Sequence, residues 1–188
     1  VDATTGLITT VAGTGMRGSW TEEAEGQPAS TVEIGQPTGI DIDAEGNLFV
    51  ADPWSHMIRR VDAQTQAMTR VVGNWDGEEL VDGMHALDVW LDDLTHIAVG
   101  PDGSIYFTDI ERIRKVDGAT GIVETFVGNG AWGFSGDGGP AASAQVSEPQ
   151  DLVVDDAGNV YVADGENGRV RLVTASTGII TTVVGSGE

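Results

Sequence analysis

The sequence contains no cysteine, a single lysine (Lys115) and no uninterrupted apolar run of about 18 residues. Without cysteine no disulfide framework can form, and without a long apolar run no membrane insertion is expected. Basic residues are also scarce: 30 aspartates and glutamates against 9 lysines and arginines leave a net charge of -21. This charge excludes nucleic acid as a partner and predicts repulsion from anionic membranes.

The sequence also lacks an initiator methionine and a secretory leader. It opens on VDATTG, a stretch that belongs to a pattern repeated later. We therefore expect a processed or excised piece of a longer chain. The acidic, lysine-poor composition suits a high-salt habitat and an ordinary secreted bacterial protein equally well. We expect an extracellular or periplasmic location.

Glycine is abundant, with 27 residues, and the sequence repeats itself. One segment occurs four times at intervals of about 55 to 60 residues, and a second occurs three times. The copies are Val1–Gly13, Val61–Gly73, Val116–Gly128 and Val173–Gly185, and then Pro37–Asp52, Thr95–Asp109 and Pro149–Asp164. Alternating apolar residues bounded by Gly, Asp and Asn predict four short antiparallel strands in each repeat. Four strands with this period indicate the blades of a β-propeller rather than a helical solenoid.

The repeats predict an all-β chain of three full blades plus one extra N-terminal outer strand. The expected divisions are residues 1–15 for the extra strand, 16–73 for blade 1, 74–128 for blade 2 and 129–188 for blade 3. Three blades cannot close a ring, because propellers have about four to eight. Two chains can form a six-bladed ring as a homodimer, the remainder of a longer parent protein can complete it, or open arcs can stack in a polymer.

An irregular lead-in precedes the first strand of each repeat and aligns without a gap among the three copies. The copies are Glu25–Ile34, Asp82–Leu91 and Asp137–Val146. Each contains an alanine at the same position, namely Ala29, Ala86 and Ala141. We expect this alanine to lie where no larger side chain fits.

An aspartate and an arginine also recur, one strand apart. The aspartates Asp52, Asp109 and Asp164 end the second strand, and the arginines Arg59, Arg114 and Arg171 lie on the third. A residue that appears in every repeat is typical of structure rather than catalysis. We therefore expect an ion pair or hydrogen-bonded corner in each blade.

Tryptophan is frequent for this length, with five residues. Trp20, Trp75 and Trp132 follow the fourth strand of successive repeats, which places them on one rim of a propeller. Two interpretations stay open. These side chains either anchor their loops against the blade edges or form a contact surface for a carbohydrate or protein.

Three stretches resemble NHL repeats: GNLFVADPWSHMIRRVDAQT, YFTDIERIRKVDGATGIVETFVG and GNVYVADGENGRVRLV. The lead-in GFSGDGGPAASAQVSEPQDLVVDDAGNVYVAD is similar to those of bacterial extracellular NHL proteins and of the teneurin NHL propeller. The resemblance covers essentially the whole chain and implies a β-propeller. The Asn-His pair that names the family is not kept: Ser55 and His56 replace it in the first repeat, and Asn167 and Gly168 in the third.

The entrance of the first strand carries Gly39, His96 and Asp151 in the three repeats. Peptidyl-hydroxyglycine lyases, which resemble NHL propellers, use His in a context similar to THIAV. By that resemblance, His96 and Asp151 are candidate zinc or calcium ligands at the channel mouth, given a third ligand. The alternative is a structural His96 that hydrogen-bonds a channel water. The hairpins lack the distal Glu of a calcium loop, so no calcium is expected in them.

The sequence carries no nucleophile motif and no phosphate-binding loop, so no catalytic residue is assigned. We expect a non-catalytic binding module that presents its rim loops to a protein, peptide or glycan partner. One alternative is a metal-dependent lyase or hydrolase with its site at the channel mouth. A second alternative is a structural segment of a surface polymer or of a large extracellular protein.

Overall fold

The computed structural model describes residues 3–18 and 21–186, and it confirms the all-β fold of four-stranded antiparallel blades. Blade 1 contains β1 (Gly39–Ile42), β2 (Leu48–Asp52), β3 (Met57–Val61) and β4 (Met68–Val72). Blade 2 contains β7 (Ile97–Val99), β8 (Ile105–Asp109), β9 (Arg112–Val116) and β10 (Val123–Val127). Blade 3 contains β12 (Pro149–Val154), β13 (Val160–Asp164), β14 (Arg169–Val173) and β15 (Ile179–Val184), with β11 (Gly139–Pro140) at its outer edge.

The remaining elements are short. Strands β5 (Glu78–Glu79) and β6 (Val89–Trp90) form a small parallel pair. The helical elements are single 3-10 turns, η1 (Glu22–Ala24), η2 (Ala29–Thr31), η3 (Pro53–Ser55) and η4 (Ala141–Ser143). Within the described ranges, therefore, no helix reaches the length and apolarity of a membrane span.

Local turn chemistry explains the strand boundaries. In the hairpin between β1 and β2, the Asp43 carboxylate accepts hydrogen bonds from the backbone and side-chain N–H groups of Asn47. The Asn47 side-chain oxygen then accepts the N–H of Ala63, which follows β3. Gly46 lies between them with a φ of 84°, a conformation that favours glycine. Asp and Asn thus close the hairpin and tie it to the next turn of the same blade.

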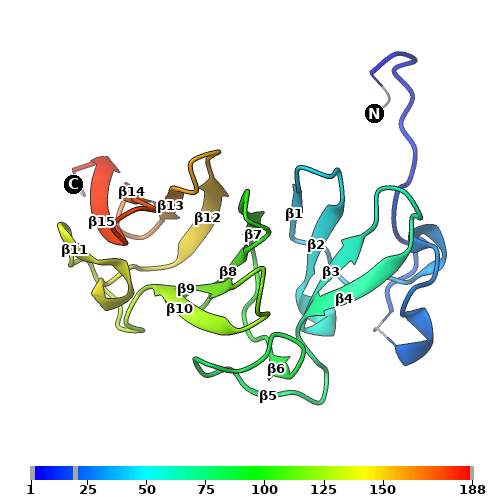
Figure 1. Cartoon of the computed structure of the whole chain (residues 1–188), viewed down its shortest axis with the longest axis horizontal. Helices are drawn as coiled ribbons and strands as arrows, with labels where there is room; N and C mark the ends of the chain where they lie inside the picture. Colours follow the sequence, from blue (N-terminus) through cyan, green and yellow to red (C-terminus); the bar gives the residue numbers. More distant parts are fainter. Residues whose placement is uncertain (1–2, 19–20, 187–188) are drawn as a thin grey trace.

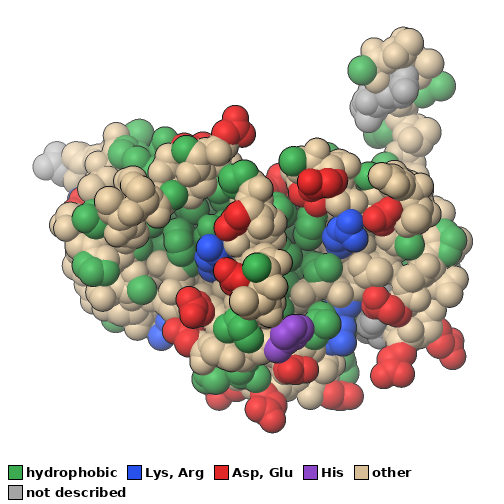
Figure 2. Space-filling view, in the orientation of Figure 1, with side chains coloured by type: hydrophobic (Ala, Val, Ile, Leu, Met, Phe, Trp, Pro, Cys, Tyr) green, Lys and Arg blue, Asp and Glu red, His purple; other side chains and the backbone are tan. Residues whose placement is uncertain are grey.

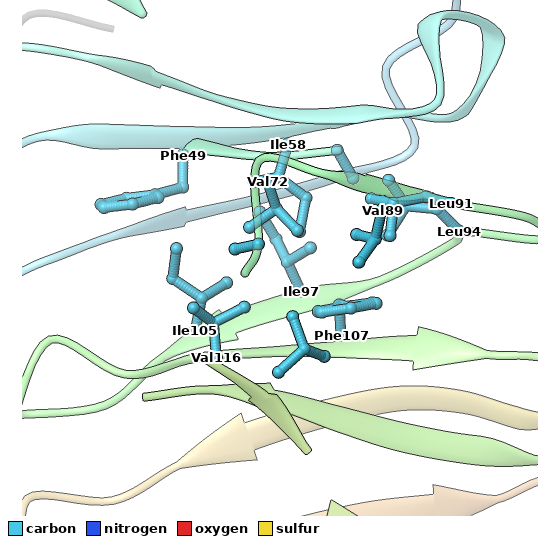
Figure 3. Close-up of a cluster of buried hydrophobic side chains, with 13 residues drawn as sticks. Phe49, Ile58, Val72, Val89, Leu91, Leu94, Ile97, Ile105, Phe107 and Val116 are labelled. Carbon is cyan, nitrogen blue, oxygen red and sulfur yellow. The ribbon is translucent and has the colours of Figure 1, made fainter. Parts of the chain in front are cut away.

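The three blades stand side by side along an arc (Figure 1). Their first strands β1, β7 and β12 line the concave side, and each later strand of a blade lies farther out. One apolar core fills the space between blades 1 and 2, and a second fills the space between blades 2 and 3. In the first core, Phe49 and Ile58 of blade 1 meet Ile97 and Phe107 of blade 2 (Figure 3). Both faces of blade 2 are therefore covered, as expected for a radial stack of sheets.

Each lead-in runs along the outer edge of its own blade and bridges to the blade before it. Bridges Pro28–Ala67 and His85–Ile122 and the pair β11–β15 make the edge contact. The recurring alanine is buried in all three lead-ins, as expected. Its carbonyl accepts a backbone N–H from the glycine that closes the preceding copy of the repeated segment Val1–Gly13. The bonds are Gly13 to Ala29 (2.9 Å), Gly73 to Ala86 (2.8 Å) and Gly128 to Ala141 (3.1 Å).

The extra outer strand predicted within residues 1–15 is not formed over its described part. Residues 3–15 belong to no sheet, and the segment projects from the blade 1 end of the arc (Figure 1, dark blue). A strand needs a neighbour that supplies hydrogen-bond partners. The repeat requires a third strand beside this segment, and no described residues occupy that place.

Candidate functional site

The predicted corner of blade 1 is a buried ion pair. Arg59 Nη2 lies 2.5 Å from Asp52 Oδ2, and both side chains are fully buried. Asp52 also accepts the Ser55 hydroxyl and the backbone N–H groups at positions 35 and 36. Arg59 donates in turn to the Glu33 carbonyl at 2.7 Å. The pair therefore fastens the end of the lead-in to the second and third strands, which is a structural role.

The other two blades repeat this corner with small changes. In blade 3, Arg171 Nη1 lies 3.2 Å from Asp164 Oδ2, and both side chains are again fully buried. In blade 2, Arg114 Nε lies 2.7 Å from Asp109 Oδ2, in a slightly more open site. Both arginines also bind a lead-in carboxylate, and these contacts are Arg171–Asp137 at 2.8 Å and Arg114–Asp82 at 2.7 Å.

The candidate metal ligands belong to the neighbouring first strands of blades 2 and 3, but they do not line the same hollow. His96 lies at the entrance to β7 and lines a hollow on the rim, whereas Asp151 is exposed and does not line it. The Asp151 carboxylate accepts the N–H of Leu152 instead. Over the described part of the chain, no group of three or more His, Asp or Glu side chains is placed to hold a metal ion. Within the described residues of one chain, His96 and Asp151 therefore have no third ligand, and the metal site at the channel mouth stays a prediction.

Of the predicted rim tryptophans, Trp20 lies outside the described residues, and Trp75 belongs to an aromatic cluster. The His56 ring stacks on Trp90 at 3.7 Å between centroids, and Trp75 approaches His56 edge-on at 5.4 Å. His56 Nδ1 lies 2.6 Å from the Leu91 carbonyl, so Nδ1 carries the proton of this hydrogen bond. The cluster joins the loop between β2 and β3 to the lead-in of blade 2.

Trp132 makes the corresponding link one blade further on. Its indole N–H donates to the Glu111 carboxylate in the turn between β8 and β9. Nearby, the Arg169 guanidinium lies 3.7 Å from the centroid of the Phe134 ring. Trp75 and Trp132 thus anchor their loops while leaving a large part of each ring exposed. The two interpretations made from the sequence are compatible.

Two adjoining hollows that share Asp93 and Thr95 lie along this rim, and together we call them the rim groove. The first has a volume of about 580 Å³ and is lined by Gln36, Thr38, Pro53, Trp54, His56, Trp75 and Leu94. The second is lined by His96, Thr108, Ile110, Glu111, Glu148, Pro149 and Gln150. The groove therefore offers aromatic faces at one end and carboxylates at the other.

Several residues that line the rim groove have unusual backbone conformations. Five described residues other than glycine have positive φ, and four of them line the rim groove. They are His56 (54°), Asp93 (48°), Ile110 (53°) and Glu148 (45°). A β-branched residue such as Ile110 rarely adopts this conformation, and strained backbone is concentrated at functional sites. Sequence reasoning missed Asp93, Ile110 and Glu148, because a positive φ leaves no mark on the residue type. It also missed Trp54, which lines the groove from the loop between β2 and β3.

The rest of the visible surface is acidic. Figure 2 shows Asp and Glu side chains spread over this face of the arc, with few Lys or Arg among them. This distribution agrees with the net charge of -21. A surface of this charge attracts cationic groups and repels anions.

Known proteins with similar sequences identify the repeats. The sequence profile of the teneurin NHL domain matches residues 133–188. Teneurin-m of Drosophila melanogaster is 37% identical over 98 residues, which is 45% of this chain and 4% of that protein. The protein SUPPRESSOR OF QUENCHING 1 of Arabidopsis thaliana is 32% identical over 163 residues, 81% of this chain and 15% of that protein.

The chain belongs to the NHL-repeat β-propeller family. A third relative of this NHL chain is a Caenorhabditis elegans protein named as a peptidyl-α-hydroxyglycine α-amidating lyase. It is 28% identical over 149 residues, which is 74% of this chain and 37% of that protein. The NHL chain thus spans well under half the length of each of these relatives.

Solved structures agree on the fold of the NHL chain. An auxiliary nutrient binding protein from Bacteroides ovatus superposes with a TM-score of 0.58 and 20% identity, over 81% of this chain and 37% of that one. At this identity the likeness concerns the fold alone. Within the NHL repeats, the loop that carries the family's Asn-His pair here holds His56 and Asn167. Asn167 donates to the Asp164 carboxylate, and His56 stacks on Trp90, so both residues brace the rim.

Proposed function

We propose that this NHL chain is a non-catalytic binding module whose rim groove receives a peptide segment of a partner protein. The observation that carries the proposal is the exposure of Trp54 (54%) and Trp75 (48%) in one groove. Large aromatic side chains usually gain stability by burial. Tryptophans that stay half exposed beside each other, on loops fixed by a rigid sheet, are typical of contact residues.

The charge of the rim groove indicates which kind of peptide it would bind. Asp93, Glu111 and Glu148 line it, and no lysine does. An ammonium or guanidinium group would gain both from these carboxylates and from the faces of the tryptophan rings. The groove therefore favours a peptide that combines Lys or Arg with an apolar side chain. A neutral glycan would use the aromatic rings but not the carboxylates.

The enzymatic alternative has less support. The lyase named among the relatives is 28% identical to this chain, and a metal-dependent reaction needs converging ligands. His96 and Asp151 are not brought to one hollow, and they have no third partner within the described residues. The extracellular or periplasmic location stays a prediction.

Binding to a peptide array and to a glycan array tests the proposal. The labelled full chain is applied to peptides that contain Lys or Arg beside Leu or Phe, to counterparts with Glu in place of the basic residues, and to a glycan array. We expect binding to the basic peptides alone. Trp54→Ala and Trp75→Ala should each weaken the affinity for a bound peptide about tenfold or more, which corresponds to about 1.4 kcal/mol.

The matched control is Val81→Ala, which removes an exposed apolar side chain outside the rim groove. Its affinity should equal that of the unaltered chain. Binding to glycans alone would replace the peptide by a carbohydrate ligand. Affinities that do not respond to either tryptophan substitution would exclude the rim groove as the site.

A further inference from the structure

Two loops of the chain contain an asparagine followed by glycine. Asn129–Gly130 lies between β10 and β11, and Asn167–Gly168 lies between β13 and β14. Asparagine in this context can lose its side-chain amide, because glycine has no Cβ that would keep its backbone nitrogen away from that amide. The two pairs differ in how firmly the fold holds them, and this difference decides which of them can react.

The reaction needs only water. The backbone nitrogen of the glycine loses its proton and forms a bond to Cγ of the asparagine, the bond from Cγ to Nδ2 breaks, and ammonia leaves with the proton. Water then opens the cyclic imide at either of its carbonyl groups, which leaves an aspartate or an isoaspartate. The glycine nitrogen and the amide must approach each other, so hydrogen bonds that hold either group raise the barrier.

The Asn167 pair is held by hydrogen bonds at both reacting groups. Asn167 is half-buried, and its Nδ2 donates to the Gly133 carbonyl at 2.9 Å and to Asp164 Oδ1 at 2.8 Å. The N–H of Gly168, which would have to attack, donates to the Gly165 carbonyl at 3.0 Å. All three bonds must break before the nitrogen and the amide can react.

The Asn129 pair is held much less. Asn129 and Gly130 are both exposed, and Asn129 Nδ2 makes a single long hydrogen bond, of 3.4 Å, to the Ser143 carbonyl. The N–H of Gly130 has no hydrogen-bond partner within the described residues. Asn129 Oδ1 accepts the N–H of Ala131 at 2.9 Å, which keeps the amide folded back over the intervening backbone. The attacking nitrogen is therefore free, and the amide lies close to it.

An arginine lies beside both pairs. Arg112 Nη2 donates to the Asn129 carbonyl at 3.2 Å, and Arg169 Nη1 donates to the Asn167 carbonyl at 2.8 Å. A hydrogen bond to this carbonyl draws electrons from the amide nitrogen of the following glycine, and a positive charge favours that nitrogen in its deprotonated form. The two pairs share this feature, so they differ mainly in the hydrogen bonds of the asparagine amide and of the glycine N–H.

We propose that Asn129 is a site of spontaneous deamidation in the folded chain, whereas the fold protects Asn167. The product adds a negative charge at the beginning of the loop that carries Trp132. An isoaspartate also adds one carbon to the backbone ahead of Trp132, whose indole N–H donates to Glu111. The proposal is independent of the ligand of the rim groove.

Asn74 offers a comparison within the preceding repeat. It occupies the position of Asn129, because each of the two follows the glycine that closes the repeated segment. The Asn74 side-chain oxygen also accepts the N–H of the second residue after it, that of Asp76 at 3.3 Å. The next residue is Trp75, whose large side chain hinders the approach of its backbone nitrogen. We therefore expect Asn74 to react more slowly than Asn129, although the turn is the same.

The test measures deamidation residue by residue. The full chain is kept at mildly alkaline pH, once folded and once in urea, and samples are digested at acidic pH so that digestion adds no deamidation. Mass spectrometry follows the peptides that contain Asn74, Asn129 and Asn167, since each lost amide raises the mass by one unit. In the folded chain we expect Asn129 to react at least about tenfold faster than Asn167, because Asn167 must first lose its hydrogen bonds. In urea these two rates should become similar, and Asn74 should react slowest.

Two variants complete the experiment. Asn129→Asp supplies the reference peptide, from which a peptide with isoaspartate separates by chromatography at the same mass. Asn129→Gln is the control, because its longer side chain forms a cyclic imide far more slowly and should abolish the mass gain at this position. Similar rates at Asn129 and Asn167 in the folded chain would overturn the protection by hydrogen bonds. An Asn129 that reacts in urea but not in the folded chain would show that its loop is restrained, and would overturn the proposal.

Discussion

At the scale of single residues, the buried corners decide how each blade is held together. Asp52 accepts hydrogen bonds from two backbone N–H groups, from the Ser55 hydroxyl and from Arg59. Burial lowers the pKa of the Arg59 guanidinium from its usual value, and the negative charge of Asp52 acts in the opposite direction. A guanidinium nevertheless stays protonated in proteins. Removal of Asp52 would therefore leave a buried positive charge without its counterion.

We predict that Asp52→Ala lowers the free energy of unfolding by about 3–5 kcal/mol, the usual cost of breaking a buried ion pair. Urea denaturation followed by circular dichroism measures the change. Arg60→Ala is the matched control, because Arg60 follows Arg59 on β3 but pairs with Asp62 at a site where both side chains are about one-third exposed (32% and 30%). This control should lose less than about 1 kcal/mol. Equal losses in the two variants would contradict a special role for the buried corner.

At the scale of elements, the turns before the outer strands depend on single carboxylates. Asp62 Oδ1 accepts the N–H groups of Gln64 and Thr65 and the Thr65 hydroxyl, and Asp117 Oδ1 accepts the same set from Ala119 and Thr120. Hydrogen bonds from Thr65 lower the pKa of Asp62 below its usual value, and those from Thr120 lower the pKa of Asp117. The charged forms are thus favoured in the folded state.

These depressed pKa values predict a stability loss in acid. The stability that ionised Asp62 and Asp117 contribute is fully present above the pKa of about 3.9 that an aspartate has in the unfolded chain. It is lost as pH falls through the lower pKa values of these carboxyls in the folded state. We predict that the melting temperature drops below about pH 4 and that Asp62→Asn with Asp117→Asn reduces this drop. Asparagine keeps an oxygen that can accept the same bonds but does not titrate. Melting curves from about pH 7 to about pH 2.5 measure the effect.

Glu124→Gln provides the control for this comparison, because Glu124 is an exposed carboxylate on β10 whose side chain accepts no hydrogen bond within the described residues. This substitution should not change how the melting temperature falls with decreasing pH. A double Asp variant as acid-sensitive as the unaltered chain would show that other carboxylates control the transition.

The elements were predictable from the sequence where their determinants are local. Strands such as β2 and β13 are short, mostly apolar runs that begin after hairpins whose Asp, Gly and Asn satisfy the turn. The outer strand expected within residues 1–15 forms no sheet over residues 3–15, because pairing depends on a neighbouring strand and not on the segment itself. The rim groove was anticipated only through Trp75 and His96, since it forms where loops of consecutive repeats meet. Trp54 comes from one repeat and Asp93 from the next, and no local pattern joins them.

At the scale of the whole molecule, the exposed apolar side chains and the net charge have opposite effects on association between copies of the chain. The arc leaves an apolar face at each end, which favours association by burial of Ile40, Val153 and Val184. The net charge of -21 opposes association, because two copies with the same sign repel each other. The balance between these effects depends on ionic strength. Salt screens the repulsion over a Debye length of about 10 Å at 0.1 M and about 3 Å at 1 M, while the apolar contribution remains.

We therefore predict that association of two copies of this chain into a pair strengthens with salt. The dissociation constant of the pair, measured by sedimentation, should fall as sodium chloride rises from about 0.01 M to about 1 M. The chain with Val153→Glu and Val184→Glu should remain single at every concentration of salt, which separates screening from non-specific precipitation. Pairing that weakens with salt would mean that opposite charges meet across the interface. In that case ion pairs would outweigh the overall repulsion, and the exposed valines and isoleucines would not be the main source of the affinity.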